Sequence, residues 1–261
     1  MDKKFILITG ASGGIGYELA HLFAKDRHNL LLVARNEQKL TELANTLAST
    51  YSIEAKVLPK DLTNPQAPQE IFDYCQSEGM TIDGLVNNAG FGNFGLFAET
   101  DLVKEMEMVQ VNITALTYLT KLFLPKMVER KSGKIMNVAS TAAFQPGPYL
   151  ANYSATKAYV LSLTEAIANE VKGTGVSVSA LCPGPTETGF QSAANMDNSK
   201  NFEAGKVMDV KSVAKAGYNG LMNGKTTIIP GKMNFIMATS VRFGPRKLIP
   251  SIVRKMVEPK S

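Results

Sequence analysis

Short apolar runs alternate with longer helical patterns along the chain, and this alternation limits the possible folds more than any other feature of the sequence. The runs have the length and composition of buried strands. They occupy residues 4–9, 29–34, 53–58, 82–86, 134–139, 175–181 and 226–229. Strands separated by helices lie parallel in one sheet, with helices on both faces. We therefore expect an α/β fold with one doubly wound parallel sheet. No repeat or linker marks a second domain, so residues 1–261 are expected to form a single domain.

The helical patterns lie between these runs, at 17–26, 36–50, 65–78, 101–130, 151–173 and 210–223. The pattern at 101–130 is long enough for two helices, which we expect to meet near Glu105. Asn112 lies inside this pattern, and a mid-helix asparagine on its own is typical of a solvent-facing position or a local kink. Residues 189–207 are polar with weak periodicity, so we expect a mobile loop there that closes over a substrate.

A glycine-rich turn, TGASGGIG at residues 9–16, joins the first expected strand to the first expected helix. Its glycines, Gly10, Gly14 and Gly16, permit tight turning and close approach of the backbone, although their spacing differs from GxGxxG. The N-terminus of the following helix offers amide donors and a positive dipole to phosphate. Strand, glycine turn and helix in this order predict a dinucleotide-binding loop. The alternative is an ordinary turn, which glycines also serve.

Arg35 follows the second expected strand, at the place where a carboxylate is expected if a free ribose 2′-hydroxyl is bound. No carboxylate appears until Glu37. A guanidinium group suits a 2′-phosphate, to which Ser12 of the glycine-rich turn could add a hydroxyl. The pattern therefore favours NADP(H) over NAD(H). The alternative is that Arg35 is a solvated loop residue.

The segment 137–157, NVASTAAFQPGPYLANYSATK, combines residues suited to acid–base chemistry. Ser140 ends an expected strand, and Tyr153 and Lys157 follow on an expected helix. Because residues four apart lie on the same face of a helix, we expect the ammonium group to lower the pKa of the phenol. Such a tyrosine can exchange a proton with an alcohol or a carbonyl oxygen. The alternative is a surface Tyr-x-x-x-Lys pair on an amphipathic helix.

Composition and charge narrow the classes of function. The net charge of +5 comes without a dense Arg/Lys block or a basic stripe with aromatic residues, so no nucleic-acid partner is expected. Cys75 and Cys182 lack metal-ligand spacing, so no metal site is expected, and they fit a reducing compartment. The N-terminal apolar run is too short for a signal peptide, and no stretch approaches the roughly 18 apolar residues of a membrane span. We expect a cytoplasmic protein.

The segment after Gly231 is apolar, bears methionines and is basic. A lid that packs on a substrate pocket is the favoured interpretation, because Pro245 and Pro250 interrupt any long helix. The alternative is a basic amphipathic helix on a membrane surface, so weak membrane-surface contact stays open.

Four motifs together resemble those of the short-chain dehydrogenase/reductase family over roughly residues 4–231. They are TGASGGIG at 9–16, NNAG at 87–90, YSATK at 153–157 and PGPTET at 183–188. Ser140 also precedes Tyr153 by the family's spacing. Asn112 falls where the family has its fourth catalytic residue, which helps to hold a water chain that relays protons to the lysine. The resemblance implies a Rossmann fold and an NAD(P)-dependent oxidoreductase.

The resemblance also implies roles for individual residues. Tyr153 would exchange a proton with the reacting oxygen, Lys157 would lower the Tyr153 pKa and hold the nicotinamide ribose, and Ser140 would orient the reacting oxygen. Asp61 and Leu62 would flank the adenine. The residues expected to contact the cofactor are Gly10, Ser12, Gly14, Ile15, Gly16, Arg35, Asp61, Leu62, Asn88, Ala89, Gly90, Tyr153, Lys157, Pro183, Gly184, Thr186 and Thr188.

We therefore expect an NADP(H)-dependent oxidoreductase that transfers a hydride between the nicotinamide and a carbonyl or secondary alcohol. Residues 1–135 would form the cofactor half, 136–231 the catalytic and substrate half, and 232–261 a lid or tail. The apolar bias of the loops favours a lipophilic substrate, such as a ketone, an aldehyde, a steroid-like molecule or an acyl chain. Two alternatives stay open: a non-catalytic NADP(H) sensor, and a membrane-surface or scaffold protein acting through the basic C-terminal segment. The resemblance also implies a homodimer or homotetramer formed through the helices at 101–130 and 151–173.

Overall fold

The computed structural model describes residues 3–194, 196 and 207–259. Within them the chain forms a seven-stranded sheet in the order β3-β2-β1-β4-β5-β6-β7, and every neighbouring pair is parallel. The strands are β1 (Lys3–Thr9), β2 (Asn29–Ala34), β3 (Ala55–Pro59), β4 (Met80–Asn87), β5 (Gly133–Val138), β6 (Val176–Leu181) and β7 (Thr227–Ile228). The expected doubly wound parallel sheet is confirmed, and each expected apolar run overlaps one of its strands. The strand order reverses between β1 and β4, which is where such sheets bind ligands.

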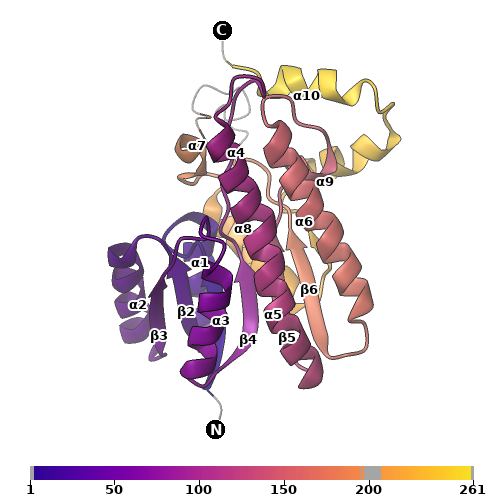
Figure 1. The fold of residues 1–261 in the computed structure, drawn as a ribbon. Coiled ribbons are helices and arrows are strands. Elements are labelled where there is room, and N and C mark those ends of the chain that lie inside the picture. Colours follow the sequence, from indigo (N-terminus) through magenta and orange to yellow (C-terminus); the bar gives the residue numbers. More distant parts are fainter. Residues whose placement is uncertain (1–2, 195, 197–206, 260–261) are drawn as a thin grey trace.

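The α-helices are α1 (Gly14–Lys25), α2 (Glu37–Tyr51), α3 (Ala67–Ser77), α4 (Leu102–Val109), α5 (Leu116–Glu129), α6 (Ala151–Glu170), α7 (Phe190–Ala193), α8 (Val210–Met222), α9 (Lys232–Ser240) and α10 (Ile249–Val257). Shorter turns are a π-helical turn η1 (Gln110–Ala115) and 3₁₀ turns η2 (Thr141–Phe144) and η4 (Val241–Phe243). Figure 1 shows α4, α5 and α6 in front of the sheet, and α9 and α10 at the end of the molecule away from the N-terminus. No helix in the described part of the chain is long and apolar enough to cross a membrane.

Two apolar cores lie on the two faces of the sheet. Alternate residues of a strand point to opposite faces, so Ile6 and Ile8 pack toward α1, α2 and α8, while Phe5 and Leu7 pack toward α3 and α5. All four side chains are buried. The near-continuous apolar character of β1 is thus explained, because helices cover both of its faces.

The helix at 101–130 differs from the expectation. It begins after Asp101, whose side chain accepts a hydrogen bond from Lys104 N at 2.9 Å, and it runs without a break through α4, η1 and α5. The expected junction near Glu105 is wrong, because Glu105 is a buried residue within α4. The irregularity lies instead in the π-helical turn, where one extra residue is accommodated without ending the helix.

The segment after Gly231 folds back as two short helices, α9 and α10, joined through η4. Pro245 lies in the break between them, as expected, but Pro250 stands in the first turn of α10, where proline does not interrupt a helix. Of the segment expected to be a mobile loop, residues 190–193 form α7, and Ala194 and Met196 are buried. Residues 195 and 197–206 lie outside the described residues.

Candidate active site

One cavity of about 690 Å³ opens at the carboxyl ends of the strands. It extends from the glycine-rich turn after β1 to the inner side of α9 and α10. The predicted site residues that line it are Gly10, Ser12, Gly14, Ile15, Arg35, Asn88, Ala89, Gly90, Ser140, Tyr153, Lys157, Pro183, Gly184, Thr186 and Thr188. Residues chosen from separate motifs therefore surround a single space.

The glycine-rich turn presents an open helix N-terminus to this cavity. Gly10 and Gly14 have φ angles of 66° and 56°, in the left-handed region that favours glycine. A Cβ on Gly16 would lie 2.5 Å from the carbonyl oxygen of Gly10, so the backbone can approach this closely only without a side chain. Gly13 caps α1 without a side-chain hydrogen bond, whereas Asn36 caps α2 through its side chain. The first amides of α1 are therefore not capped by a side chain, which fits the pyrophosphate of a dinucleotide.

Arg35 and Ser12 line the cavity at its glycine-turn end. Arg35 follows β2 directly and is exposed. Its guanidinium forms no ion pair or hydrogen bond with any other residue that the structure describes. Five donors are thus available at the place where a 2′-phosphate was expected.

Asn88 and Thr9 join the loop after β4 to the glycine-rich turn. Asn88 Nδ2 donates to the carbonyl oxygens of Thr9 at 2.9 Å and Gly10 at 3.1 Å. The Thr9 hydroxyl accepts from the amides of Asn88 and Ala89, both at 3.0 Å, and donates to Val86 O at 3.3 Å. The predicted site residues omitted Thr9, although it begins the TGASGGIG motif. Its position at the end of a strand, directly before the glycines, could have identified Thr9 as a residue of the site.

Asn112 lies in the π-helical turn and is fully buried, so the solvent-facing interpretation is wrong. Its Nδ2 donates to Phe91 O at 3.0 Å and to Thr156 Oγ1 at 3.1 Å. Its Oδ1 accepts from Phe91 N at 3.1 Å. Asn112 therefore holds the loop after β4 against the turn of α6 that carries Lys157, although it does not itself line the cavity.

Tyr153, Lys157 and Ser140 line the central part of the cavity. Lys157 Nζ lies 5.7 Å from the centroid of the Tyr153 ring and donates to Val138 O at 2.9 Å. Burial raises the pKa of Tyr153 to about 12, and a hydrogen bond with Ser140 partly opposes this rise. Burial lowers the pKa of Lys157 to about 8, against the attraction of Cys182 for the charged ammonium.

The expected lowering of the Tyr153 pKa by Lys157 is therefore wrong for this arrangement. The phenol is buried, and loss of hydration disfavours its anionic form more than its polar neighbours favour it. The ammonium group, for its part, is hydrogen-bonded to the backbone of β5. At neutral pH Tyr153 consequently carries its proton.

Three predicted cofactor residues, Gly16, Asp61 and Leu62, do not line the cavity. Gly16 lies behind the cavity wall, where the lack of a side chain lets its backbone approach the Gly10 carbonyl closely. Asp61 accepts a hydrogen bond from Thr63 N at 3.0 Å, and Leu62 is buried in the core toward α3 and α5. The predicted contact of Asp61 and Leu62 with adenine stays a prediction.

Sequence reasoning missed a buried carboxylate beside the catalytic helix. Glu105 accepts from Asn93 Nδ2 at 3.0 Å and from Asn152 Nδ2 at 2.8 Å, and its carbonyl oxygen accepts from Asn152 at 3.0 Å. This connection fixes α4 and the loop after β4 to the first turn of α6, next to Tyr153. Nothing in the spacing of these three residues distinguishes them from exposed polar residues.

Phe190 and the segment 232–259, hereafter the roof segment, cover the cavity on the side away from the sheet. The Phe190 ring lies 5.4 Å from that of Tyr153. The roof segment contributes apolar side chains from its inner side, which are Met237, Ala238, Val241, Ile249, Ile252, Val253, Met256 and Val257. Arg254 of α10 donates to Tyr149 Oη at 3.3 Å and lies 5.2 Å from the Tyr149 ring centroid. The lid interpretation of this segment agrees with these contacts.

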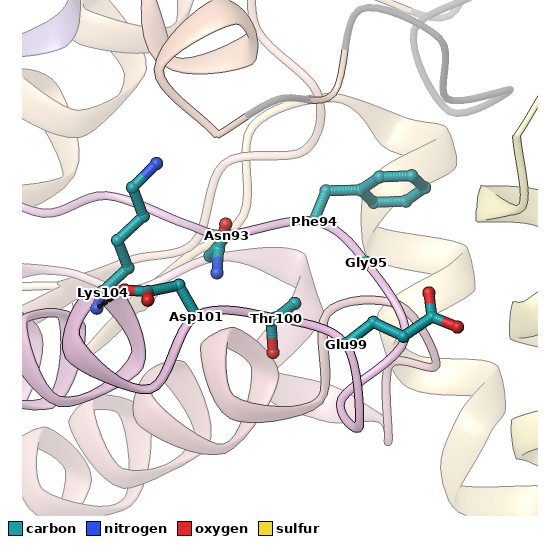
Figure 2. Close-up of a pocket in the computed structure, with 7 residues that line it drawn as sticks. All are labelled: Asn93, Phe94, Gly95, Glu99, Thr100, Asp101 and Lys104. Atoms are coloured by element: carbon teal, nitrogen blue, oxygen red, sulfur yellow. Dashed lines mark hydrogen bonds between the residues drawn. The ribbon is translucent and has the colours of Figure 1, made fainter.

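A second hollow, of about 320 Å³, lies outside this site. Figure 2 shows it between the 93–95 loop and the start of α4, with Phe94 and Lys104 at its two ends. Neither Tyr153 nor Lys157 lines it. The hollow is polar and lacks the converging catalytic groups, so the chemistry belongs to the larger cavity.

Comparison with known proteins identifies the family. The model of the short chain dehydrogenase family matches residues 4–199. The chain is a member of this family. It is therefore an oxidoreductase of the Rossmann fold, as the motifs indicated.

Three relatives show how far the likeness extends. The ketoacyl reductase HetN of Nostoc sp. is 33% identical over 232 residues, which cover 88% of this chain and 79% of HetN. The structure of a short-chain dehydrogenase from Sphingobium yanoikuyae in complex with NADPH has a TM-score of 0.84 and 30% identity, and 92% of each chain is covered. The structure of a 7beta-hydroxysteroid dehydrogenase has a TM-score of 0.85 and 26% identity, with 97% of this chain and 96% of the other covered.

Proposed function

We propose that this short-chain dehydrogenase uses NADP(H) to interconvert a lipophilic carbonyl compound and its secondary alcohol. One observation carries the proposal. A single cavity joins the uncapped N-terminus of α1 and Arg35 at one end to Tyr153 at its centre and the apolar roof segment at the other. Its two ends have opposite character, one suited to phosphates and the other to hydrocarbon.

The cofactor end supports NADP(H) over NAD(H). NADPH supplies the hydride for carbonyl reduction, and the chain supplies the groups that hold it. Arg35 can meet a 2′-phosphate with two charge-assisted hydrogen bonds, and Ser12 lies at the same end of the cavity. No carboxylate stands at residue 35 to receive a free 2′-hydroxyl. The Sphingobium relative was solved with NADPH, which agrees with this choice.

The catalytic residues support carbonyl reduction. Tyr153 has a pKa of about 12 and so holds a proton that it can give to a developing alkoxide. Ser140 shares a hydrogen bond with Tyr153 and can direct the same oxygen. The Lys157 ammonium, hydrogen-bonded to Val138 O, adds positive charge next to the phenol and can hold the cofactor ribose. In the direction of alcohol oxidation, Tyr153 would first have to lose its proton.

The substrate end supports a bulky lipophilic molecule. Apart from Ser240, the side chains that the roof segment and Phe190 place around the cavity are apolar, and none of those from the roof segment is charged. HetN is named for a ketoacyl substrate and the 7beta-hydroxysteroid dehydrogenase for a steroid, and both substrates are largely hydrocarbon. An acyl-chain or steroid-like ketone is therefore the first substrate class to test.

The test is consumption of NADPH by the purified protein with a panel of steroid, acyl-chain and short polar ketones. Tyr153→Phe should lower turnover by about 10²- to 10⁴-fold while NADPH still binds, because the ring stays and only the proton donor is lost. Tyr159→Phe is the matched control, since Tyr159 lies on the same helix and bonds Thr117 instead of lining the cavity. Binding of NADPH with no turnover of any ketone would favour the non-catalytic sensor.

Cofactor choice has its own test, titration of NADPH and NADH into wild type and Arg35→Asp. A charge-assisted hydrogen bond contributes about 1.5–3 kcal/mol. The wild type should therefore prefer NADPH by roughly 10- to 150-fold. Arg35→Asp should invert the preference, because the aspartate repels the phosphate and accepts from the free hydroxyl. Equal affinities in the wild type would remove Arg35 as the discriminating residue.

We further propose that the protein forms a homodimer or homotetramer through α4, α5 and α6. Exposed apolar side chains gather on these helices, including Leu102, Val103, Met106, Tyr118 and Tyr159. Sedimentation equilibrium of wild type and Met106→Glu tests this, since a buried charge at the contact should produce monomers.

A further inference from the structure

The roof segment holds the entire net charge of the protein. Residues 232–259 contain six basic residues and one acidic residue, Glu258, which gives +5, and the whole chain also has a net charge of +5. The remaining residues are therefore neutral as a set. A charge this concentrated in 28 residues is a feature of one surface rather than of the protein's general solubility.

The outer side of the roof segment is also apolar. Phe243 is 84% exposed, and Met233, Phe235, Ile236 and Leu248 are exposed as well. None of these five side chains lines the cavity. Figure 1 shows the loop between α9 and α10 projecting from the body of the molecule. Large apolar side chains at a projecting loop are costly in water, so they indicate a partner.

The loop contains both cations and large apolar side chains. Residues 242–248 read RFGPRKL, and all are exposed. Arg242, Arg246 and Lys247 form no ion pair or hydrogen bond with any residue in the described part of the chain. Their charges are therefore free to meet an external anion. Arg254 is different, since it is bonded to Tyr149 and holds the roof segment to the body.

We propose that the roof segment docks on an anionic phospholipid surface. In this position Phe243 and Leu248 enter the boundary between headgroups and acyl chains, and Arg242, Arg246 and Lys247 meet lipid phosphates. Each Lys or Arg near an anionic membrane strengthens binding about fivefold, which corresponds to about 1 kcal/mol. Apolar side chains among such cations add hydrophobic burial to this attraction.

A second copy of the chain fits this surface less well. In a two-fold contact the same patch meets itself, so a segment of charge +5 would face its own charge. The exposed apolar side chains of α4 have the opposite surroundings, with Glu99, Asp101 and Glu107 nearby in sequence. Even with Lys104 counted, that surface has a net negative charge, so an anionic membrane does not attract it and it suits a protein contact better. The two apolar surfaces are therefore assigned to different partners.

Membrane docking would place the cavity beside the lipid. The inner side of the roof segment lines the cavity while its outer side meets the membrane, so a lipophilic molecule has a short path between the two. The docking does not depend on the proposed reaction, because it concerns the outer side of the segment only. It can therefore be tested without a substrate.

The experiment is co-sedimentation of the full chain with vesicles of phosphatidylcholine alone and of phosphatidylcholine with phosphatidylglycerol. Wild type should bind the anionic vesicles and not the neutral ones. The double variant Arg246→Gln/Lys247→Gln should bind about 25-fold more weakly. Phe243→Ser should bind at least about tenfold more weakly. Raising the salt from about 0.1 M to 1 M should abolish binding, because the screening length falls from about 10 Å to 3 Å.

Matched controls come from the acidic apolar surface. Phe97→Ser removes a phenylalanine that is 68% exposed, and Lys104→Gln removes an exposed cation of α4. Neither should change vesicle binding, and thermal melting of every variant reports whether it is folded. Equal binding to neutral and anionic vesicles, or equal losses in the controls, would overturn the proposal. So would a Phe243→Ser variant that keeps vesicle binding but lowers the oligomeric mass in sedimentation equilibrium, since the surface would then be a protein contact.

Discussion

The floor and the roof of the cavity are built from different interactions. The floor, made by Thr9, Asn88, Asn112 and Lys157, is held by hydrogen bonds from side chains to the backbone and to one another. The roof segment meets the cavity mainly through apolar side chains and is held to the body by packing and by hydrogen bonds from Arg254 and Asn234. Hydrogen bonds fix directions and positions, whereas apolar contacts fix only shape and volume. The floor therefore positions the reacting atoms, whereas the roof segment selects the substrate by its shape.

Gly16→Ala should cause the largest loss, because it places a Cβ 2.5 Å from the Gly10 carbonyl in the floor. Neither backbone segment can give way without moving the turn. We expect the free energy of unfolding to fall by about 3 kcal/mol or more, measured by urea denaturation. Gly13→Ala is the control: a Cβ there meets nothing within 4 Å, and its φ of −178° suits any residue. Equal losses in both variants would refute a tightly packed floor.

Lys157 should give the floor a distinctive dependence on pH. Its pKa is about 8 in the folded protein against 10.5 in the unfolded chain, so its burial opposes folding fully below pH 8 and ceases to do so above pH 10.5. The free energy of unfolding of wild type minus that of Lys157→Met should therefore rise between pH 8 and 10, by about 2 to 3 kcal/mol. The difference cancels the opposite contributions of Tyr153 and Cys75, whose raised pKa values weaken folding at alkaline pH. A flat difference would mean that Lys157 is not buried as described.

Glu105→Gln should lower the free energy of unfolding by less than Gly16→Ala does. The carboxylate accepts from both Asn93 and Asn152, and a glutamine retains only one oxygen for the two donors. We expect unfolding to cost about 1 to 2 kcal/mol less, measured by urea denaturation. Glu107→Gln, an exposed neighbour on the same helix, should change it little. A Glu105→Gln variant as stable as Glu107→Gln would show that the buried connection is not needed.

Ile252→Ser in the roof segment should have the smallest effect on the free energy of unfolding, but it should raise KM for the substrate measurably. Ile252 is 58% exposed and lines the mouth of the cavity, so the free energy of unfolding should change by less than about 0.5 kcal/mol. Loss of its contact should raise KM for a lipophilic ketone several-fold with little change in kcat. Leu248→Ser is the control, being 57% exposed in the same segment but outside the cavity. Equal KM changes in the two variants would contradict a role for Ile252 in substrate contact.

The sequence could predict features that depend on local patterns, but not those that depend on how distant segments pack. The strands and the glycine-rich turn follow from local patterns, because burial on both faces and left-handed φ angles each require particular residue types. The positions of Ser140, Tyr153 and Lys157 around one cavity follow from the ends of parallel strands meeting at one edge. The helical pattern alone could not predict the burial and contacts of Asn112, since they depend on a π-helical turn that such a pattern does not reveal.

The direction in which the Tyr153 pKa is shifted also could not be predicted from the sequence. Spacing showed that Lys157 would lie one turn away, but not that both groups would be buried. Burial is a property of the assembled fold, and it outweighed the neighbouring charge. Composition and prolines led to the interpretation of the roof segment as a lid, while the residues that its inner side places in the cavity required the structure.

The strand order has a consequence for how the protein folds during synthesis. β1 pairs with β4, with Leu7 opposite Leu85, so the centre of the sheet forms only after three intervening helices and two strands have been made. Such distant pairings slow folding. The roof segment follows every strand in the chain and therefore leaves the ribosome after all of them. A nascent chain therefore completes its nucleotide-binding floor while the apolar half of the cavity still faces water, and for that interval the unfinished enzyme presents the kind of surface that chaperones bind.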